Sequence, residues 1–193
     1  MKNPYNAYRN ALLEKKESLN FRSLNALEIE GKYVIQNNRR LLNLSSNDYL
    51  GISTYEDIRQ EFLKNYDKPL SVPSARLLCA NTTSYEKLEV LLSQKFKKEA
   101  TLLFNSGYHA NVGIYSALAK KGDVVFCDKL NHASIIDGIR LGGADLIPFK
   151  HVNYEDLESK LKRYASKYEN VIIATEALFS MDGDFCDIKN SLN

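Results

Sequence analysis

Short apolar runs alternate with longer amphipathic segments from residue 100 onward. The predicted strands are 101–104, 123–127, 145–149 and 171–175. The helices predicted between them are 107–120, 133–141 and 154–168. Buried strands that alternate with helices are typical of a parallel sheet whose connections cross over through helices. The pattern therefore predicts an α/β fold, with a mostly parallel sheet flanked by helices.

The pattern before residue 100 is weaker. Apolar side chains at helical spacing predict an N-terminal helix to about residue 18. Residues 20–40 are mixed and polar, so we expect an extended or irregular segment there, followed by a short strand over 41–44. We divide the chain into an N-terminal helix with an extended segment, 1–40, and a large domain, 41–193.

Two further helices are predicted before residue 100. The first carries Tyr55, Ile58 and Phe62. The second begins with a capping box, in which Thr83 and Glu86 would satisfy the first backbone N–H groups. Its apolar face is Leu88, Leu91, Leu92 and Phe96.

Composition excludes several classes of protein. An apolar content of 44% and a charged content of 26% over 193 residues are ordinary for a globular domain. A net charge of +2 gives no reason to expect nucleic acid as a partner, and no apolar run approaches the ~18 residues of a membrane span. Three cysteines without a C-x-x-C motif favour the reducing cytoplasm.

The residues that follow each predicted strand are the candidates for a ligand site. In open parallel sheets, ligands bind beyond the carboxyl ends of the strands. The first such junction, Asn105-Ser106-Gly107, opens a helix, whose unpaired N–H groups and positive dipole end suit an anion such as phosphate. The alternative is an ordinary helix cap that binds nothing.

The second junction contains His132, which also follows a strand and opens a helix. An imidazole there could stack on an aromatic cofactor or move a proton. The alternative is a helix-capping or solvent-exposed histidine. The three histidines lack metal-ligand spacing, so we expect no metal site.

The last junction is the segment 176–184. Glu176 and Ser180 could both point into the same cleft as His132. The alternative for Asp182-Gly183-Asp184 is a simple turn.

Taken in order, five segments resemble the motifs of the α-oxoamine synthases, fold-type-I enzymes that use pyridoxal 5'-phosphate (PLP). The segments are 43–51, 74–78, 105–111, 128–134 and 176–184. Within that family, the second and fourth segments are most similar to the biotin-pathway members. These condense L-alanine with pimeloyl-CoA or a pimeloyl carrier protein and release CO2. Other members of the family use glycine and acetyl-CoA with the same cofactor.

The resemblance implies a set of cofactor-binding residues. They are Ser106, Gly107, Tyr108, His132, Glu176 and Ser180. The first three would surround the PLP phosphate, and His132 would stack on the ring and act in catalysis. Glu176 would support the cleft and Ser180 would hydrogen-bond the cofactor.

The resemblance also implies substrate-binding residues and a partner. Arg22 matches the arginine that meets a substrate carboxylate, and Asn47 lies in a motif near the subunit interface of a homodimer. No membrane or nucleic-acid partner is implied.

The chain departs from the family in length. Members are roughly twice as long, and the remainder carries the aspartate that pairs with the pyridine nitrogen and the lysine that forms the Schiff base. No lysine here matches that motif. We therefore expect an inactive fragment of a PLP enzyme. The alternatives are a non-catalytic partner subunit and an unrelated phosphate-binding α/β protein. Strand edges left unpaired predict that the isolated chain self-associates.

Overall fold

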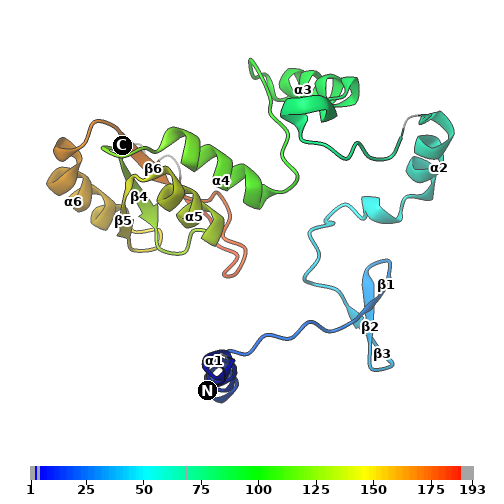
Figure 1. Ribbon diagram of the computed structural model, residues 1–193, viewed down its shortest axis with the longest axis horizontal. Coiled ribbons are helices and arrows are strands. Elements are labelled where there is room, and N and C mark those ends of the chain that lie inside the picture. The colour runs from blue at the N-terminus through cyan, green and yellow to red at the C-terminus, as the bar shows by residue number, and fades with distance from the viewer. Residues whose placement is uncertain (1–2, 4, 68, 188–193) are drawn as a thin grey trace. The chain divides into compact units, whose positions relative to one another are not determined.

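The computed structural model describes residues 3, 5–67 and 69–187 of the chain (Figure 1). It divides into two compact units, Met1–Ser71 and Val72–Asn193. The predicted domain limit after residue 40 stays a prediction.

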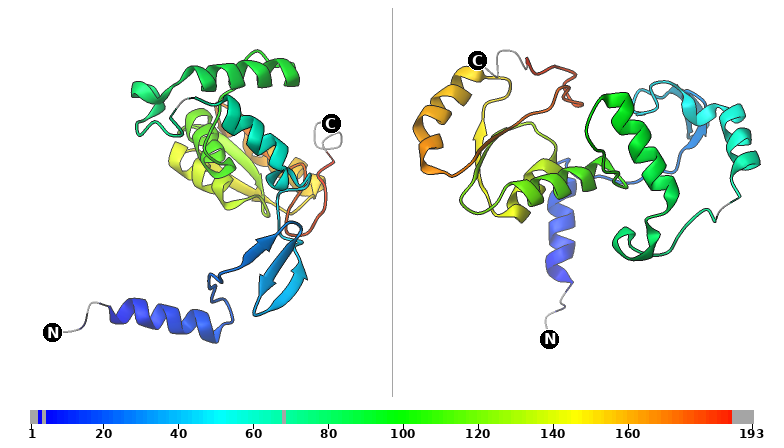
Figure 2. Two further views of the ribbon diagram at one scale, coloured as in Figure 1. Left: turned by 90° about the vertical axis from the view of Figure 1, so that its right-hand side faces the viewer. Right: turned by 90° about the horizontal axis from the view of Figure 1, so that it is seen from above.

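The first unit begins with helix α1, Asn6–Glu17, which confirms the predicted N-terminal helix. Strands β1 (Glu28–Glu30), β2 (Tyr33–Gln36) and β3 (Arg39–Leu42) then form an antiparallel meander (Figure 2). The segment 20–40, predicted to be extended or irregular, is extended in these strands, but their pairing into a sheet was not predicted.

Two tight turns explain the meander. Gly31 lies between β1 and β2 with φ +57°, and Asn37 and Asn38 join β2 to β3 with φ +50° and +59°. Two consecutive positive φ angles are characteristic of a type I′ hairpin turn, which asparagine tolerates. The Asn-Asn pair was the available sequence signal for this hairpin.

A turn and a helix complete the first unit. The carboxylate of Asp48 accepts hydrogen bonds from the N–H groups of Ile52 (2.9 Å) and Ser53 (3.2 Å). It thereby caps the 3-10 turn Ile52–Thr54, which precedes helix α2, Glu56–Asn65. None of the unit's described residues is buried.

The second unit contains a parallel sheet with the strand order β5-β4-β6. The strands of this sheet and the helices that pack on it are, in chain order, α4 (Gly107–Leu118), β4 (Val124–Asp128), α5 (Ala133–Gly142), β5 (Asp145–Phe149), α6 (Tyr154–Tyr164) and β6 (Val171–Ala174). In the register, Val124 lies opposite Asp145 on one side and Val171 on the other. This arrangement confirms the predicted α/β fold and its alternation of strands and helices.

All five residues of the central strand β4 are buried. Because side chains alternate between the faces of a strand, β4 contributes to two cores. Val125 and Cys127 pack with α5, whereas Val124 and Phe126 pack with Leu157 of α6. Helix α6 thus covers one face of the sheet and α4 with α5 the other (Figure 1).

Helices α4 and α5 pack closely because α5 presents glycines to α4. A Cβ atom on Gly138 would lie 2.9 Å from the carbonyl oxygen of Asn111. A Cβ atom on Gly142 would lie 2.0 Å from that of Ala119. Such distances leave no room for a side chain, so the close crossing requires glycine at both positions.

Helix α3, Thr83–Phe96, contains the four residues of the predicted apolar face but lacks the predicted cap. Its N-cap residue is Thr82, and the Thr82 side chain makes no capping hydrogen bond. The capping-box prediction is therefore wrong. Most of the predicted apolar face is exposed, with 58% exposure at Leu91 and 66% at Phe96, while Leu92 is half-buried.

The predicted strand 101–104 is also wrong: this segment pairs with no strand of the described residues. Side chains bind its backbone instead. The carboxylate of Glu89 accepts a hydrogen bond from the Leu103 N–H (2.8 Å), and Arg76 donates to the Leu103 carbonyl oxygen (3.2 Å). Arg76 and Glu89 are themselves joined by an ion pair of 2.9 Å. A strand needs a neighbouring strand to bind its backbone groups. Here the side chains of the Arg76–Glu89 ion pair bind them instead.

Candidate active site

The start of α4 is capped and open. Ser106 is the N-cap residue, and its hydroxyl oxygen accepts a hydrogen bond from the His109 N–H (3.3 Å). The other N–H groups of a first helical turn point out of the helix, where the dipole is positive. A Cβ atom on Gly107 would meet no described atom within 4 Å. The capping interpretation is correct, and the helix start is still accessible to an anion.

Tyr108 connects the start of α4 to α5. Its hydroxyl group donates a 2.5 Å hydrogen bond to the carboxylate of Asp137, and this bond raises the pKa of Tyr108. Its ring lies edge-on to the ring of His132, with 6.2 Å between the centroids.

His132 is the N-cap residue of α5. Its Nδ1 accepts a hydrogen bond from the Ser134 N–H (3.2 Å), so the capping alternative is confirmed for this nitrogen. The backbone N–H of His132 donates to the carboxylate of Glu176. The residue is exposed, and stacking on a cofactor stays a prediction.

Asn131, next to His132, is buried and joins two strand ends. Its Nδ2 donates to the Ala174 carbonyl oxygen (2.8 Å) and to Cys127 Sγ (3.1 Å). Its Oδ1 is buried and has no hydrogen-bond partner among the described residues. Burial raises the pKa of Cys127, which keeps this neighbour a neutral thiol.

The segment after β6 folds back on itself. Gly183 has φ +76°, and the Phe179 N–H donates to the Asp184 carbonyl oxygen (3.0 Å). The turn interpretation of 182–184 is therefore correct. Ser180 is exposed on this segment, while Glu176 contacts His132. The structure thus brings Tyr108, His132 and Glu176 together, and the role of Ser180 stays a prediction.

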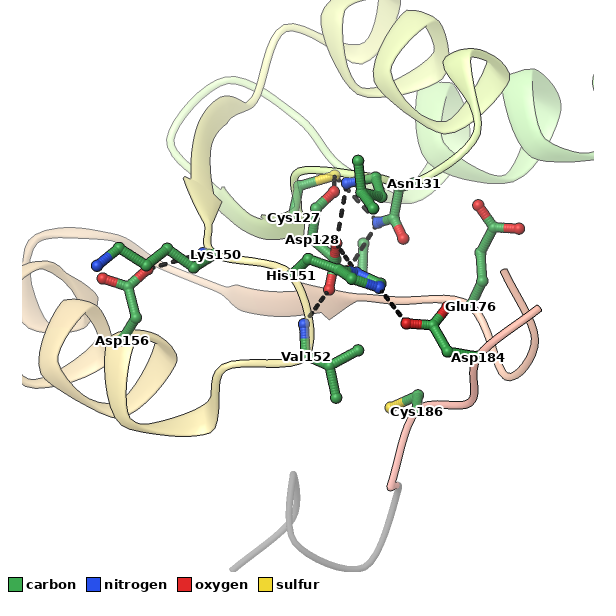
Figure 3. Close-up of polar contacts among 12 residues, drawn as sticks. Cys127, Asp128, Asn131, Lys150, His151, Val152, Asp156, Glu176, Asp184 and Cys186 are labelled. Carbon is green, nitrogen blue, oxygen red and sulfur yellow. Dashed lines mark hydrogen bonds and ion pairs between the residues drawn. The ribbon is translucent and has the colours of Figure 1, made fainter. Parts of the chain in front are cut away.

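A second polar cluster was missed from the sequence. His151 lies between two carboxylates, with Nδ1 2.9 Å from Asp128 Oδ1 and Nε2 2.7 Å from Asp184 Oδ2 (Figure 3). Each of these residues ends or follows one of the three parallel strands. That shared position at the carboxyl edge of the sheet was the signal that could have revealed the cluster.

Arg22 and Asn47 lie in the first unit. Both are exposed and lie outside its helices and strands. Their roles in substrate binding stay predictions.

The described residues show neither a metal site nor a membrane span. No group of three or more His, Cys, Asp or Glu side chains there could hold a metal ion. Within the same residues, every helix is too short or too polar to cross a membrane.

The fold and this site place the chain in a known class. Residues 39–191 match the family model of aminotransferase class I and II, and the chain belongs to that family.

Individual relatives show which members of the family the chain is similar to. The chain is 48% identical over 169 residues to the 8-amino-7-oxononanoate synthase of Haemophilus ducreyi, which covers 84% of this chain and 44% of that protein. The chain spans about half the length of the curated relatives that it matches.

Solved structures of PLP-dependent enzymes have a similar fold. A serine palmitoyltransferase variant from S. paucimobilis with bound PLP has a TM-score of 0.79 at 25% identity, covering 97% of this chain and 48% of that one. An 8-amino-7-oxononanoate synthase from Francisella tularensis has a TM-score of 0.60 at 30% identity, covering 75% and 39%.

Proposed function

We propose that this chain contributes part of the cofactor site of a PLP-dependent acyltransferase. The reaction is the decarboxylative condensation of L-alanine with a pimeloyl thioester, which gives 8-amino-7-oxononanoate. The observation that carries the proposal is the meeting of two helix starts and the segment after β6, through Tyr108, His132 and Glu176. Relatives of that name support the choice of reaction.

The residues of the site fit PLP. The open helix start at Gly107 suits a phosphate dianion, because N–H groups and the helix dipole favour negative charge there. The exposed imidazole of His132 suits the face of an aromatic ring. The buried Oδ1 of Asn131 is an acceptor that still needs a donor. When bound, PLP supplies an electron sink that stabilises a carbanion on the amino acid.

The chain's own residues have distinct tasks in this proposal. The N–H groups of Gly107 and Tyr108 bind the phosphate, in a turn whose shape Ser106 fixes. His132 stacks on the ring and acts in catalysis. Glu176 holds the His132 backbone in place.

Three further residues have roles that the resemblance implies. Ser180 hydrogen-bonds the cofactor. Arg22 meets a substrate carboxylate, and Asn47 lies near the subunit interface. The motif order shared with the α-oxoamine synthases supports these roles.

The proposed partners follow from the same resemblance. They are L-alanine, pimeloyl-CoA or a pimeloyl carrier protein, and a second copy of the chain in a cytoplasmic homodimer. The names of the relatives support the proposal of these two substrates.

The test is an assay of the protein encoded by the complete gene. We expect turnover with L-alanine and a pimeloyl thioester, and little with glycine and acetyl-CoA. The reverse preference would indicate 2-amino-3-ketobutyrate CoA ligase instead. No turnover with either pair would refute the proposed reaction.

A non-catalytic partner subunit is the candidate from another class, because no lysine of the chain matches the family motif. The coding sequence downstream of residue 193 decides this point. A lysine motif within it would refute the partner-subunit alternative.

A further inference from the structure

The cluster of Asp128, His151 and Asp184 has no task in the proposed function. Asp128 ends β4, and His151 lies two residues beyond β5. Asp184 belongs to the segment after β6, which also carries Glu176 (Figure 3). The cluster therefore joins the carboxyl ends of all three parallel strands on the side where the candidate site lies.

The hydrogen-bond geometry fixes the charge state of His151. A neutral imidazole has one N–H donor and one acceptor nitrogen, whereas an imidazolium donates from both. Both ring nitrogens of His151 lie at hydrogen-bond distance from carboxylate oxygens. With both carboxyl groups ionised, one of the two contacts would be repulsive for a neutral ring, so the arrangement favours the imidazolium.

Asp128 is held in place from several directions. Its Oδ2 accepts from the Val152 N–H and its Oδ1 from the Leu130 N–H, both at 2.9 Å. Its side chain is 1% exposed. The two backbone N–H groups and the His151 ring are the groups that stabilise this buried carboxylate.

The rest of the segment 176–187 is attached around the same histidine. The buried ring of Phe179 lies edge-on to His151, with 4.5 Å between the centroids. Helix α6 adds a hydrogen bond of 2.7 Å from the Asp187 N–H to the hydroxyl oxygen of Tyr154. Asp184 supplies the charged contact of the segment to His151.

We propose that His151 is a positioning residue: as an imidazolium it joins Asp128 to Asp184 and thereby fastens the segment 176–187 to the carboxyl edge of the sheet. The effect of His151 on cofactor binding rests on the proposed function, because the segment carries Glu176 and Ser180. The attachment of the segment to the sheet is independent of the proposed function.

The attachment depends on pH in a definite direction. Burial lowers the pKa of His151. Asp128 and Asp184 raise it by more, through their hydrogen bonds to the ring and through their negative charge, so the pKa lies above its usual 6.5. In helix α6, Asp156 and Lys160 pair with each other at 2.8 Å, and the Tyr154 hydroxyl contacts Cys186 Sγ at 3.4 Å, so Asp128 and Asp184 are the charges that act on His151. Because this pKa is raised in the folded state, the protonated ring stabilises the folded segment at low pH. This stabilisation is lost as the pH rises through the pKa of His151.

The first test is NMR of the isotope-labelled chain without PLP. The sequence has three histidines, so single His→Asn variants assign the ring signals. We expect both ring nitrogens of His151 to be protonated at neutral pH, and the Asp184→Asn variant to titrate at lower pH. Asp182→Asn, on the same exposed turn, is the matched control and should leave the titration unchanged. A neutral His151, or a titration equal in both variants, would overturn the proposal.

Hydrogen exchange of the peptides covering 176–187 tests the attachment, and it also works on an associated chain. Asp184→Asn should reduce protection about tenfold near neutral pH, which is the cost of one charged hydrogen bond. Asp182→Asn should not. The difference from wild type should shrink as the pH rises through the His151 pKa. A difference that is independent of pH would show that Asp184 only shapes the turn, and would overturn the proposal.

Equilibrium dialysis with PLP then separates the two proposals. We expect weaker PLP binding by Asp184→Asn than by Asp182→Asn. Equal binding by both would refute the effect of His151 on the cofactor. If the wild-type chain shows no PLP binding, the proposed function fails, while NMR and exchange still decide whether His151 fastens the segment.

Discussion

Strand β4 and one face of helix α3 are both apolar in sequence, but only β4 is buried. Val124 and Phe126 of β4 are completely inaccessible, whereas Leu91 of α3 is 58% exposed. The strand has β5 and β6 beside it and helices on both faces, while α3 presents its apolar side to solvent. Periodicity thus predicts which element forms, but burial depends on partners that the local sequence does not name.

The largest expected effect of this difference is self-association. Exposed side chains of α3, together with the outer edge of β6, offer apolar surface and unpaired backbone groups. We predict that the purified chain is oligomeric or aggregates, and sedimentation velocity measures this directly. A monodisperse monomer with one cooperative calorimetric transition would contradict the prediction.

Paired substitutions test the contrast in packing. Phe126→Ala should lower the free energy of unfolding by about 3–5 kcal/mol, because it leaves a cavity in a filled core. Leu91→Ala should change it by about 0.5 kcal/mol or less, as is usual for exposed sites. Chemical denaturation measures both values. A cost at Leu91 as large as that at Phe126 would show that α3 is covered in solution.

Two glycines allow a comparison between a closely packed position, Gly142, and an open one, Gly107. Gly142→Ala should destabilise the fold by about 2–3 kcal/mol, since its Cβ would collide with the carbonyl oxygen of Ala119. Gly107→Ala places its Cβ away from every described atom and should preserve stability, measured by the same denaturation. It should still weaken PLP binding, because the added methyl group occupies the open helix start. Equal stability losses in the two variants would contradict the described crossing of α4 and α5.

The smallest expected effect concerns the segment 101–104. Glu89→Gln should increase hydrogen exchange at Leu103, because the Leu103 N–H and Arg76 both bind the Glu89 carboxylate. Glu86→Gln is the matched control, since Glu86 only accepts a 3.4 Å hydrogen bond from Asn81.

The same contact predicts a pH dependence. The hydrogen bond from Arg76 and then that from Leu103 lower the pKa of Glu89 below its usual 4.5. The protection should therefore persist at neutral pH and decline as the pH falls through the lowered pKa. Protection at Leu103 that is the same at neutral and acid pH would show that the carboxylate charge is not what holds the segment.

Much of the sheet could be predicted from the sequence, because β4, β5, β6 and their helices show strong periodicity. The strand predicted at 101–104 failed for a physical reason: a short, mostly apolar segment has no ladder without a neighbouring strand. The 28–42 meander was missed because its residues alternate weakly and its turn signal is the pair Asn37-Asn38.

The candidate site was predictable in part. Position after a strand marked His132 and Glu176 as candidates, and the structure joins these two residues. The same rule marked Asp128, His151 and Asp184 without showing that they contact one another, since their pairing depends on strand order. Local sequence carries no record of that order, so the β5-β4-β6 arrangement had to come from the structure.

PLP binding by the chain itself tests the central claim most directly. Equilibrium dialysis should compare PLP with pyridoxal, which lacks the phosphate, for the wild type and for His132→Ala. Borohydride reduction and peptide mapping should follow. We predict weak PLP binding that requires the phosphate, is reduced in His132→Ala, and labels no single lysine stoichiometrically. Equal binding of pyridoxal and PLP, or one stoichiometrically labelled lysine together with measurable condensation activity, would contradict the account.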